Sequence, residues 1–348
     1  MAANLRVLRR RIKSTKNIAQ ITKAMEMVAA SRISKAQARV EAARPYSEEF
    51  THVLRTAAKA GASDHPLLTP REEPKRAAIV VVTSDRGLCG GYNANVLRET
   101  ERLIRRLDDE GKESTLYVIG GKGTAYFRFR NREMSGQFTG FSEVPDYSNA
   151  AHAADHLTAA FLAGGENEVS VDWDEDEHAD SGADRKVMFR APQDAEGKPG
   201  VDEIHVVFTQ FRSMLTQTAV ALQVAPLDLE SEDDESETSG SDDSSSSGGS
   251  GGSDDSDGSG RDAEYAFEPE PEVLFDSLLP KYVRARVFAA MLDAAASESA
   301  ARQRAMKAAT DNANDLVDNL VRESNQARQA QITQEISEIV GGSDALAQ

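Results

Sequence analysis

The sequence predicts a mixed α/β protein in which two long terminal helices flank a smaller α/β middle region. Three observations support this fold class. Residues 3–58 and 273–340 contain no glycine and one proline each, Pro45 and Pro280. Both segments carry apolar residues at spacings of three and four, which is typical of helices that pack through a narrow stripe. Between them, short β-rich runs alternate with helical stretches, as they do in α/β domains.

The N-terminal segment, 1–60, is predicted to be one helix of a coiled coil. Ile18, Ile21, Met25 and Val28 follow one another at spacings of three, four and three, and we expect them to form the contact seam. At 1.5 Å per residue, such a helix reaches on the order of 80 Å, longer than any compact domain of this size requires. The alternative is that the helix packs on a globular core, which would call for a broader apolar stripe.

The C-terminal segment, 273–340, has the same pattern and is predicted to be the second helix of the coiled coil. The pair Gly341-Gly342 predicts its end, so that it reaches roughly 100 Å. Because both helices lie at chain ends, the simplest arrangement is an antiparallel pair with the rest of the chain as a head. The expected apolar stripe consists of Val283, Val287, Ala290, Leu316, Leu320, Ile332, Ile336 and Ile339.

The middle region, 75–227, is predicted to be an α/β head. The order of its elements favours parallel strand pairs early in the region and an antiparallel pair at its end. A short edge strand is also expected at 265–269. Within the head we expect strands at 76–84, 203–211 and 217–227, a strand with a turn at 114–123, and helices at 93–110 and 149–163.

The composition limits the class of protein. The 348 residues carry a formal net charge of -18, with 39% apolar residues and one cysteine, Cys89. Such an acidic chain is not expected to bind nucleic acid or anionic lipid through its overall field, and one cysteine excludes an internal disulfide. No run approaches the ~20 apolar residues of a membrane helix, and the N-terminus lacks the apolar part of a secretory signal. We therefore expect a soluble intracellular chain.

The charge is concentrated in separate segments. Residues 165–200 hold 11 acidic and 4 basic residues, and we expect a surface insertion there. Residues 228–262 hold 13 acidic residues and one arginine, and are expected to be a disordered linker because 231–260 contain no large apolar residue. His178 in the insertion is only a weak candidate metal ligand. Residues 1–60 hold 13 basic and 4 acidic residues, which makes a basic N-terminal arm.

A glycine-rich turn follows the first predicted strand, in the sequence TSDRGLCGGYN at 83–93. A strand, such a turn and a helix start can together bind an anion, but Gly87, Gly90 and Gly91 match neither the GxGxxG nor the P-loop spacing. We favour a structural role in which these glycines permit a tight backbone path. Cys89 has no histidine paired with it in the sequence and is interpreted as a small packing residue. The sequence predicts no catalytic residue, no cofactor and no metal site.

Four motifs carry a family resemblance: RRRIKSTKNIAQITKAMEMVAASRISKAQ at 9–37, TSDRGLCGGYN at 83–93, MKAATDNA at 306–313 and ARQAQITQEISEIVGG at 327–342. Present together and in this order, they resemble the gamma subunits of bacterial F-type ATP synthases. The resemblance covers the chain except for 165–200 and 228–262. It implies an antiparallel coiled coil, a Rossmann-like head and the role of a central rotor shaft that is not itself catalytic.

The resemblance also implies partners and a location. The coiled coil would lie along the axis of a hexamer of three alpha and three beta subunits, and the head would contact the epsilon subunit and the ring of c subunits. Proton-driven turning of the ring would rotate the shaft, and its asymmetric faces would move each beta subunit through its nucleotide states. ATP hydrolysis would drive the reverse, since such coupling is reciprocal. The chain would be a peripheral protein at the cytoplasmic face of the cell membrane.

Residue by residue, the motifs imply contacts with the alpha–beta hexamer. Met25 and Arg302 match positions where the two helices meet a loop of beta, and Arg328, Gln329 and Thr333 match positions higher on the shaft. For each, packing within the coiled coil or helix capping is the alternative. We predict that Met25→Lys impairs coupling, because a cation buried in the seam must find a partner or distort the helix pair. A further set of basic residues on the N-terminal helix is expected to face acidic loops of beta. The alternative is that these residues lie on a solvated helix face. The set consists of Arg9, Arg10, Arg11, Lys13, Lys16 and Lys23.

Two features depart from the family. The cysteine pair of the chloroplast form is absent, and the segment 165–200 resembles the extra loop of actinobacterial members but is longer. We predict that this insertion either regulates rotation or is neutral. Two other classes stay open as alternatives: an enzyme that uses a nucleotide or phosphate and carries helical arms, and a coiled-coil adaptor that binds nucleic acid through its basic arm.

Overall fold

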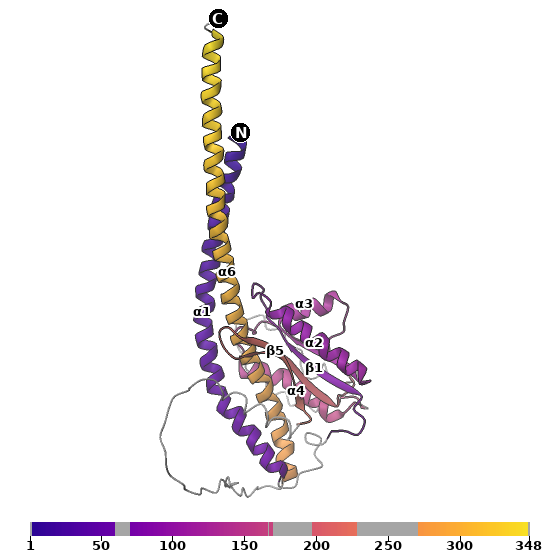
Figure 1. Ribbon diagram of the computed structural model, residues 1–348. Coiled ribbons are helices and arrows are strands. Elements are labelled where there is room, and N and C mark those ends of the chain that lie inside the picture. The colour runs from indigo at the N-terminus through magenta and orange to yellow at the C-terminus, as the bar shows by residue number, and fades with distance from the viewer. Residues whose placement is uncertain (1, 60–69, 166, 170–196, 228–270, 347–348) are drawn as a thin grey trace, which may run out of the picture.

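Two long helices dominate the molecule. The computed structural model describes residues 2–59, 70–165, 167–169, 197–227 and 271–346. Helices α1 (Ala2–Lys59) and α6 (Pro271–Leu346) run side by side in opposite directions, and the other elements form a head beside the lower part of α6 (Figure 1). Both helices lie where the glycine-free segments predicted them. None of the helices in the described ranges is long and apolar enough to cross a membrane.

The predicted end of the second helix is wrong, because α6 continues through Gly341 and Gly342 to Leu346. Glycine in a helix costs only about 1 kcal/mol relative to alanine, so two glycines weaken a helix without having to end it. The predicted division of the chain into domains stays a prediction.

The head is built on a five-stranded sheet with the order β3-β2-β1-β4-β5. β1 pairs in parallel with β2 and β4, and β2 pairs in parallel with β3. β4 and β5 are antiparallel. The predicted early parallel pairs and the final antiparallel pair are thus confirmed. The strands are β1 (Arg76–Val82), β2 (Glu113–Ile119), β3 (Gly136–Phe138), β4 (Glu203–Phe211) and β5 (Gln217–Ala225).

Helices cover both faces of this sheet. Ala78, Val80 and Val82 of β1 belong to a core shared with α4 (Tyr147–Ala163), α6 and the end of α1. The alternate residues of β1 belong to a second core, shared with α2 (Tyr92–Asp109) and α3 (Gly121–Phe129). Because both faces are buried, the strand is apolar at every position from Ala77 onward, as buried parallel strands usually are.

Two short elements were not predicted, the strand β3 and the helix α3. The sequence GGKG at 120–123, where a turn was expected after the second strand, instead forms the start of α3, with Gly120 just before its first residue. Gly120 has φ +99, and a Cβ there would lie 2.2 Å from the Thr83 carbonyl oxygen, so the tight approach requires glycine. The edge strand predicted at 265–269, the linker 228–262 and most of the insertion 165–200, including His178, lie outside the described residues.

Candidate functional site

The contact between α1 and α6 is made by small and apolar side chains in a heptad pattern. On α1, the buried positions Leu8, Thr15, Ala19, Ala29 and Ile33 follow spacings of four and three or their sums. On α6 they are matched by Met306, Thr310, Ala313, Val317 and Leu320. The hydroxyls of Thr22 and Thr310 lie 2.7 Å apart and set the register of the two helices.

The stretch of the α1 seam predicted from Ile18 to Val28 is displaced by one residue. Ile18 is 51% exposed, Ile21 60% and Val28 53%, while Met25 is half-buried. The neighbouring stripe, which contains Ala19 and Ala29, makes the contact, because small side chains let two helix backbones approach closely. Large apolar side chains thus lie on the outer surface of the pair. On α6 the lower part of the predicted stripe is buried, whereas Leu316, Ile332, Ile336 and Ile339 are exposed.

The upper end of α6 extends beyond α1. From Thr22 back to Ala2 is 20 residues, so Ala2 lies opposite Ala330, which is 20 residues beyond Thr310. The last 16 residues of α6, 331–346, therefore run past the start of α1 as a single helix (Figure 1). At 1.5 Å per residue this overhang is about 24 Å long. Its isoleucines Ile332, Ile336 and Ile339 are 48%, 56% and 72% exposed.

The structure places most of the predicted contact residues on exposed surface. Arg9, Arg10 and Lys13 are exposed on α1, as are Arg11, Lys16 and Lys23. Arg328, Gln329 and Thr333 are exposed on α6, just below and within the overhang. The Thr333 hydroxyl donates to the Gln329 carbonyl at 3.0 Å, which is a bond within the helix. These positions are accessible to a partner, and their contact with one stays a prediction.

Arg302 is the exception, since it is only 6% exposed and its bonds lie within the chain. It donates to the Glu298 carboxylate at 2.5 Å and forms an ion pair with Glu143 at 3.3 Å. It also donates to the carbonyls of Arg86 and Gly87, at 3.3 and 3.4 Å, in the loop after β1. The geometry thus gives Arg302 an internal contact that neither alternative named, since it attaches α6 to the head rather than packing within the coiled coil or capping a helix.

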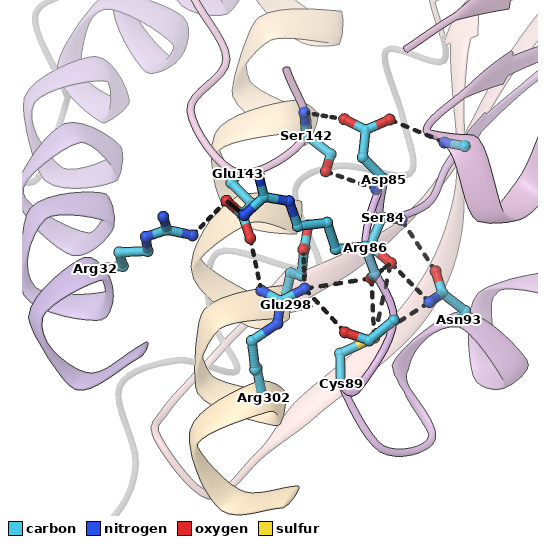
Figure 2. Close-up of polar contacts among 12 residues, drawn as sticks. Arg32, Ser84, Asp85, Arg86, Cys89, Asn93, Ser142, Glu143, Glu298 and Arg302 are labelled. Atoms are coloured by element: carbon cyan, nitrogen blue, oxygen red, sulfur yellow. Dashed lines mark hydrogen bonds and ion pairs between the residues drawn. The ribbon is translucent and has the colours of Figure 1, made fainter. Parts of the chain in front are cut away.

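Glu143 joins three parts of the molecule (Figure 2). Besides Arg302 of α6, it pairs with Arg32 of α1 and, at 3.8 Å, with Arg86 of the head. Together with Glu298 these residues form what we call the junction cluster: Arg32, Arg86, Glu143, Glu298 and Arg302. It lies at the level where the helix pair leaves the head, so it fixes the two helices to the head at that level.

Asp85 holds the loops around this cluster. Its carboxylate accepts hydrogen bonds from the backbone N–H groups of Gly121, Gly140 and Ser142, each at 2.9 Å. In return, the Asp85 N–H donates to the Ser142 hydroxyl at 2.8 Å. These bonds tie the loop after β1 to the loops after β2 and β3, so Glu143 is held beside Arg302.

Burial changes the protonation of the cluster. Burial raises the pKa of Glu298 to about 7, although Arg302 opposes the shift. Burial alone would lower the pKa of Arg302, but the charges of Glu298 and Glu143 raise it. Burial also raises the pKa of Cys89, which is 2% exposed and packed as predicted, so its thiol stays protonated at neutral pH.

Sequence reasoning missed Glu143 and Glu298. For Glu298 the signal was present, because it lies four residues before Arg302 on one helix and such pairs face each other. No sequence signal indicated Glu143, because only the folded sheet places its loop beside the two helices. Among the described residues there is no group of three histidine, cysteine or acidic side chains that could hold a metal ion.

Comparisons with known proteins agree along the whole chain. The sequence model of the ATP synthase family matches residues 4–346. The chain is 54% identical over 347 residues to the ATP synthase gamma chain of Mycolicibacterium smegmatis and 52% identical over 347 residues to that of Mycolicibacterium gilvum. Both alignments cover 100% of this chain and 99% of the relative. The gamma chain of Saccharopolyspora erythraea is 50% identical over 344 residues, with 99% and 98% covered.

Solved structures agree with the fold. The rotor of the Euglena gracilis mitochondrial ATP synthase matches with a TM-score of 0.55 and 17% identity, covering 95% of this chain and 100% of that one. The central stalk of the Tetrahymena thermophila enzyme matches with a TM-score of 0.51 and 18% identity, covering 83% and 99%. At such low identity these structures support the fold alone. With half of its residues identical to those of its relatives over their full length, the chain belongs to the family of ATP synthase gamma chains.

Proposed function

We propose that this chain is the central rotor shaft of an F-type ATP synthase and has no catalytic residues of its own. In this function α1 and α6 form the antiparallel coiled coil, and the sheet and its helices form a Rossmann-like head. The observation that carries the proposal is the overhang of α6, a single helix with a stripe of exposed isoleucines. A lone helix of this kind is marginal in water, so it calls for a partner that surrounds it.

The outer surface of the helix pair supports the same partner. Ile18, Ile21 and Val28 lie on α1 with more than half of their surface exposed, and Leu316 is 49% exposed on α6. Monomeric proteins rarely leave large apolar side chains exposed in a continuous stripe unless another surface covers them. We assign this stripe, with Met25, to contact with the inside of the alpha–beta hexamer. Arg328, Gln329 and Thr333 would make the contacts higher on the shaft.

The basic residues at the start of α1 would orient the shaft but add little to its affinity for the hexamer. Arg9, Arg10 and Lys13 are exposed, so their attraction to acidic loops of beta is screened by salt and contributes little to affinity. Their value lies in biasing the angle of the shaft against each beta subunit. Because that bias must be reciprocal, the nucleotide bound on beta would in turn favour one shaft angle.

The head would transmit rotation from the membrane side. The helix pair leaves the head at one end (Figure 1), and we assign the opposite end of the head to contact with the epsilon subunit and the ring of c subunits. The chain would then be a peripheral protein at the cytoplasmic face of the cell membrane, moved by the proton-driven ring. The junction cluster supports this role, since it joins the head to both helices at the base of the shaft.

Co-purification tests the proposal most directly. The chain is expressed with alpha and beta subunits from the same source, and the purified complex is analysed by native mass spectrometry and ATPase assay. We expect one copy of the chain with three alpha and three beta subunits, and ATP hydrolysis by the complex. A well-folded chain that fails to associate with the two subunits would contradict the proposal and would favour an enzyme or an adaptor.

Met25→Lys tests the contact surface in the complete enzyme, assembled with its ring of c subunits in membrane vesicles. Met25 is half-buried rather than buried, so the lysine can reach water along α1 and the isolated chain should stay folded. We expect fewer protons pumped per ATP hydrolysed, because the new cation faces the hexamer. Phe129→Lys is the control, since Phe129 is an exposed apolar residue on α3 of the head, outside the proposed contact of the helix pair with the hexamer. Equal pumping ratios in both variants and the wild type would remove Met25 from the contact surface.

A further inference from the structure

We propose that Glu298 is a proton-operated switch in the junction cluster, and that its protonation tightens the contact between α6 and the head. Glu298 lies on α6 and is only 1% exposed. The rotor function proposed above gives this buried carboxyl group no task. The evidence for the switch consists of contacts within this chain, and only its use in regulating rotation rests on the proposed function.

The guanidinium of Arg302 is shared between two carboxylates (Figure 2). Its Nη2 atom donates to Glu298 on the same helix at 2.5 Å, and to the carbonyls of Arg86 and Gly87 in the head at 3.3 and 3.4 Å. Its Nη1 atom lies 3.3 Å from Glu143 of the head. This second nitrogen is buried, yet among the described residues it has no partner at hydrogen-bonding geometry. Arg302 is therefore bonded closely to its own helix and incompletely to the head.

The two carboxylates repel each other across this arginine, and they differ in the cations around them. The charge of Glu143 disfavours the ionised form of Glu298. Glu143 also pairs with Arg32 of α1 and Arg86 of the head, whereas Glu298 forms its ion pair with Arg302. A proton that enters the cluster is therefore taken up by Glu298 before Glu143.

The other titratable groups that face Glu298 keep their protonation state near neutral pH. Cys89 and Tyr92 approach it from the loop after β1 and the start of α2, and burial raises the pKa of both, so the thiol and the phenol stay protonated. Burial alone would lower the pKa of Arg302, but the charge of Glu298 raises it, so Arg302 stays positive. Burial raises the pKa of Glu298 to about 7, because the pair with Arg302 opposes this shift only in part. Glu298 therefore changes its charge close to neutral pH.

Protonation of Glu298 would move Arg302 toward the head. Hydrogen bonds to an ionised acceptor are roughly twice as strong as those to a neutral one, so the protonated carboxyl holds the guanidinium less tightly. The repulsion between the two carboxylates also disappears, and the guanidinium can turn its unsatisfied Nη1 atom onto Glu143. The new O–H group of Glu298 can donate to the hydroxyl of Ser142 in the head, which already interacts with it. A bond within α6 is thus replaced by bonds between α6 and the head.

Hydrogen–deuterium exchange of the full chain at pH 6 and pH 8, corrected for the intrinsic exchange rates, tests the switch. In the wild type, amides of α6 near Arg302 and of residues 140–144 should exchange about tenfold more slowly at pH 6 than at pH 8. Glu298→Gln imitates the protonated form, so these amides should exchange slowly at both pH values. Glu143→Gln removes the charge toward which Arg302 turns, so they should exchange fast at both.

Glu323→Gln is the matched control, because Glu323 is an exposed glutamate of the same helix, and it should keep the pH dependence of the wild type. Circular dichroism checks the folding of every variant, and if Glu298→Gln does not fold, the wild type and Glu143→Gln decide. Exchange in the wild type that does not change with pH would overturn the proposal, as would wild-type pH dependence in either Glu298→Gln or Glu143→Gln. Because every measurement uses the isolated chain, a failure to assemble with alpha and beta would refute the rotor function and leave this result unchanged.

Discussion

The lower and upper halves of α6 form one continuous helix, but they have different surroundings. From Tyr282 to Ala300 the helix is enclosed by α1, α4 and the sheet, and Val283, Val287 and Ala296 are fully buried. From Met306 to Leu320 only one residue in three or four is buried, against α1, and none from 321 to 330 is buried. Beyond residue 330 the helix has no part of α1 opposite it.

Along α6, the residues that stabilise the fold are therefore separate from those that are exposed for binding a partner. A helix buried on all sides is rich in small and apolar residues, and alanines fill much of the lower half. In the upper half Val317 and Leu320 still pack against α1, but other large apolar residues lie on the outer surface, where they add little to the stability of the isolated chain: Leu316, Ile332, Ile336 and Ile339. We therefore expect substitutions to lose their effect on folding, and to gain effect on the assembled complex, as they move up α6.

Val287→Asp in the lower half should have the largest effect on folding. Val287 is fully buried in the core shared with α4 and the sheet, so the new carboxylate would be buried without a partner. We expect a loss of about 4 kcal/mol or more in the free energy of unfolding of the full chain, measured with denaturant. Val321→Asp, the same change at a 36% exposed position of α6, should cost less than about 0.5 kcal/mol. Equal losses of unfolding free energy at both positions would show that the lower half of α6 is no more important for folding than the upper half.

Arg302→Ala tests the boundary between the two halves. It leaves the buried Glu298 without its cation, although Glu143 keeps Arg32 and Arg86, and removing one partner of a buried pair costs about 3 kcal/mol. The loss should be smaller at pH 6 than at pH 8, because Glu298 can take up a proton. Arg322→Ala, which removes an exposed arginine of the same helix, should be close to neutral. A neutral Arg302→Ala would show that the junction cluster does not hold the head.

Asp293→Asn should have a smaller effect that depends on pH. Burial raises the pKa of Asp293 to about 6, so the folded chain holds this proton more tightly than the unfolded chain. The free energy of unfolding of the wild type therefore falls as pH rises from about 4 to about 6, and the asparagine variant lacks this loss. Between these pH values, the free energy of unfolding of the variant should rise by on the order of 2 kcal/mol relative to that of the wild type. A difference in stability that is the same at pH 4 and pH 8 would contradict the shift.

The sequence predicted the fold where long patterns were present. The strand β4 was predicted with both of its ends correct, because β-branched and aromatic residues dominate its sequence, EIHVVFTQF. The strand β3 has only three residues and forms through its pairing with β2, so no local pattern indicates it. The error of one residue in the α1 seam has a related cause. Neighbouring heptad stripes share the same spacing, and the stripe with larger residues was chosen, although Ala19 and Ala29 make the contact.

The candidate site was harder to predict from the sequence than the fold. The exposed basic and polar positions of both helices followed from the family motifs, but the burial of Arg302 did not, since its partner Glu143 is distant in sequence. The glycine-rich loop was interpreted as a tight turn, and its hydrogen bonds from Arg302 of α6 arise only in the folded chain. Contacts that depend on tertiary packing leave no periodic signal in one chain.

Ile336→Ser in the overhang should have the smallest effect on the isolated chain and completes the comparison. Ile336 is 56% exposed and has no part of α1 opposite it, so we expect a change of less than about 0.5 kcal/mol in the free energy of unfolding. In the complex with alpha and beta the same change removes apolar surface from the proposed contact, and the ATPase activity or the yield of complex should fall. A stability loss as large as that of Val287→Asp would mean that the overhang packs on its own chain. An unaffected complex would mean that the hexamer does not cover this stripe.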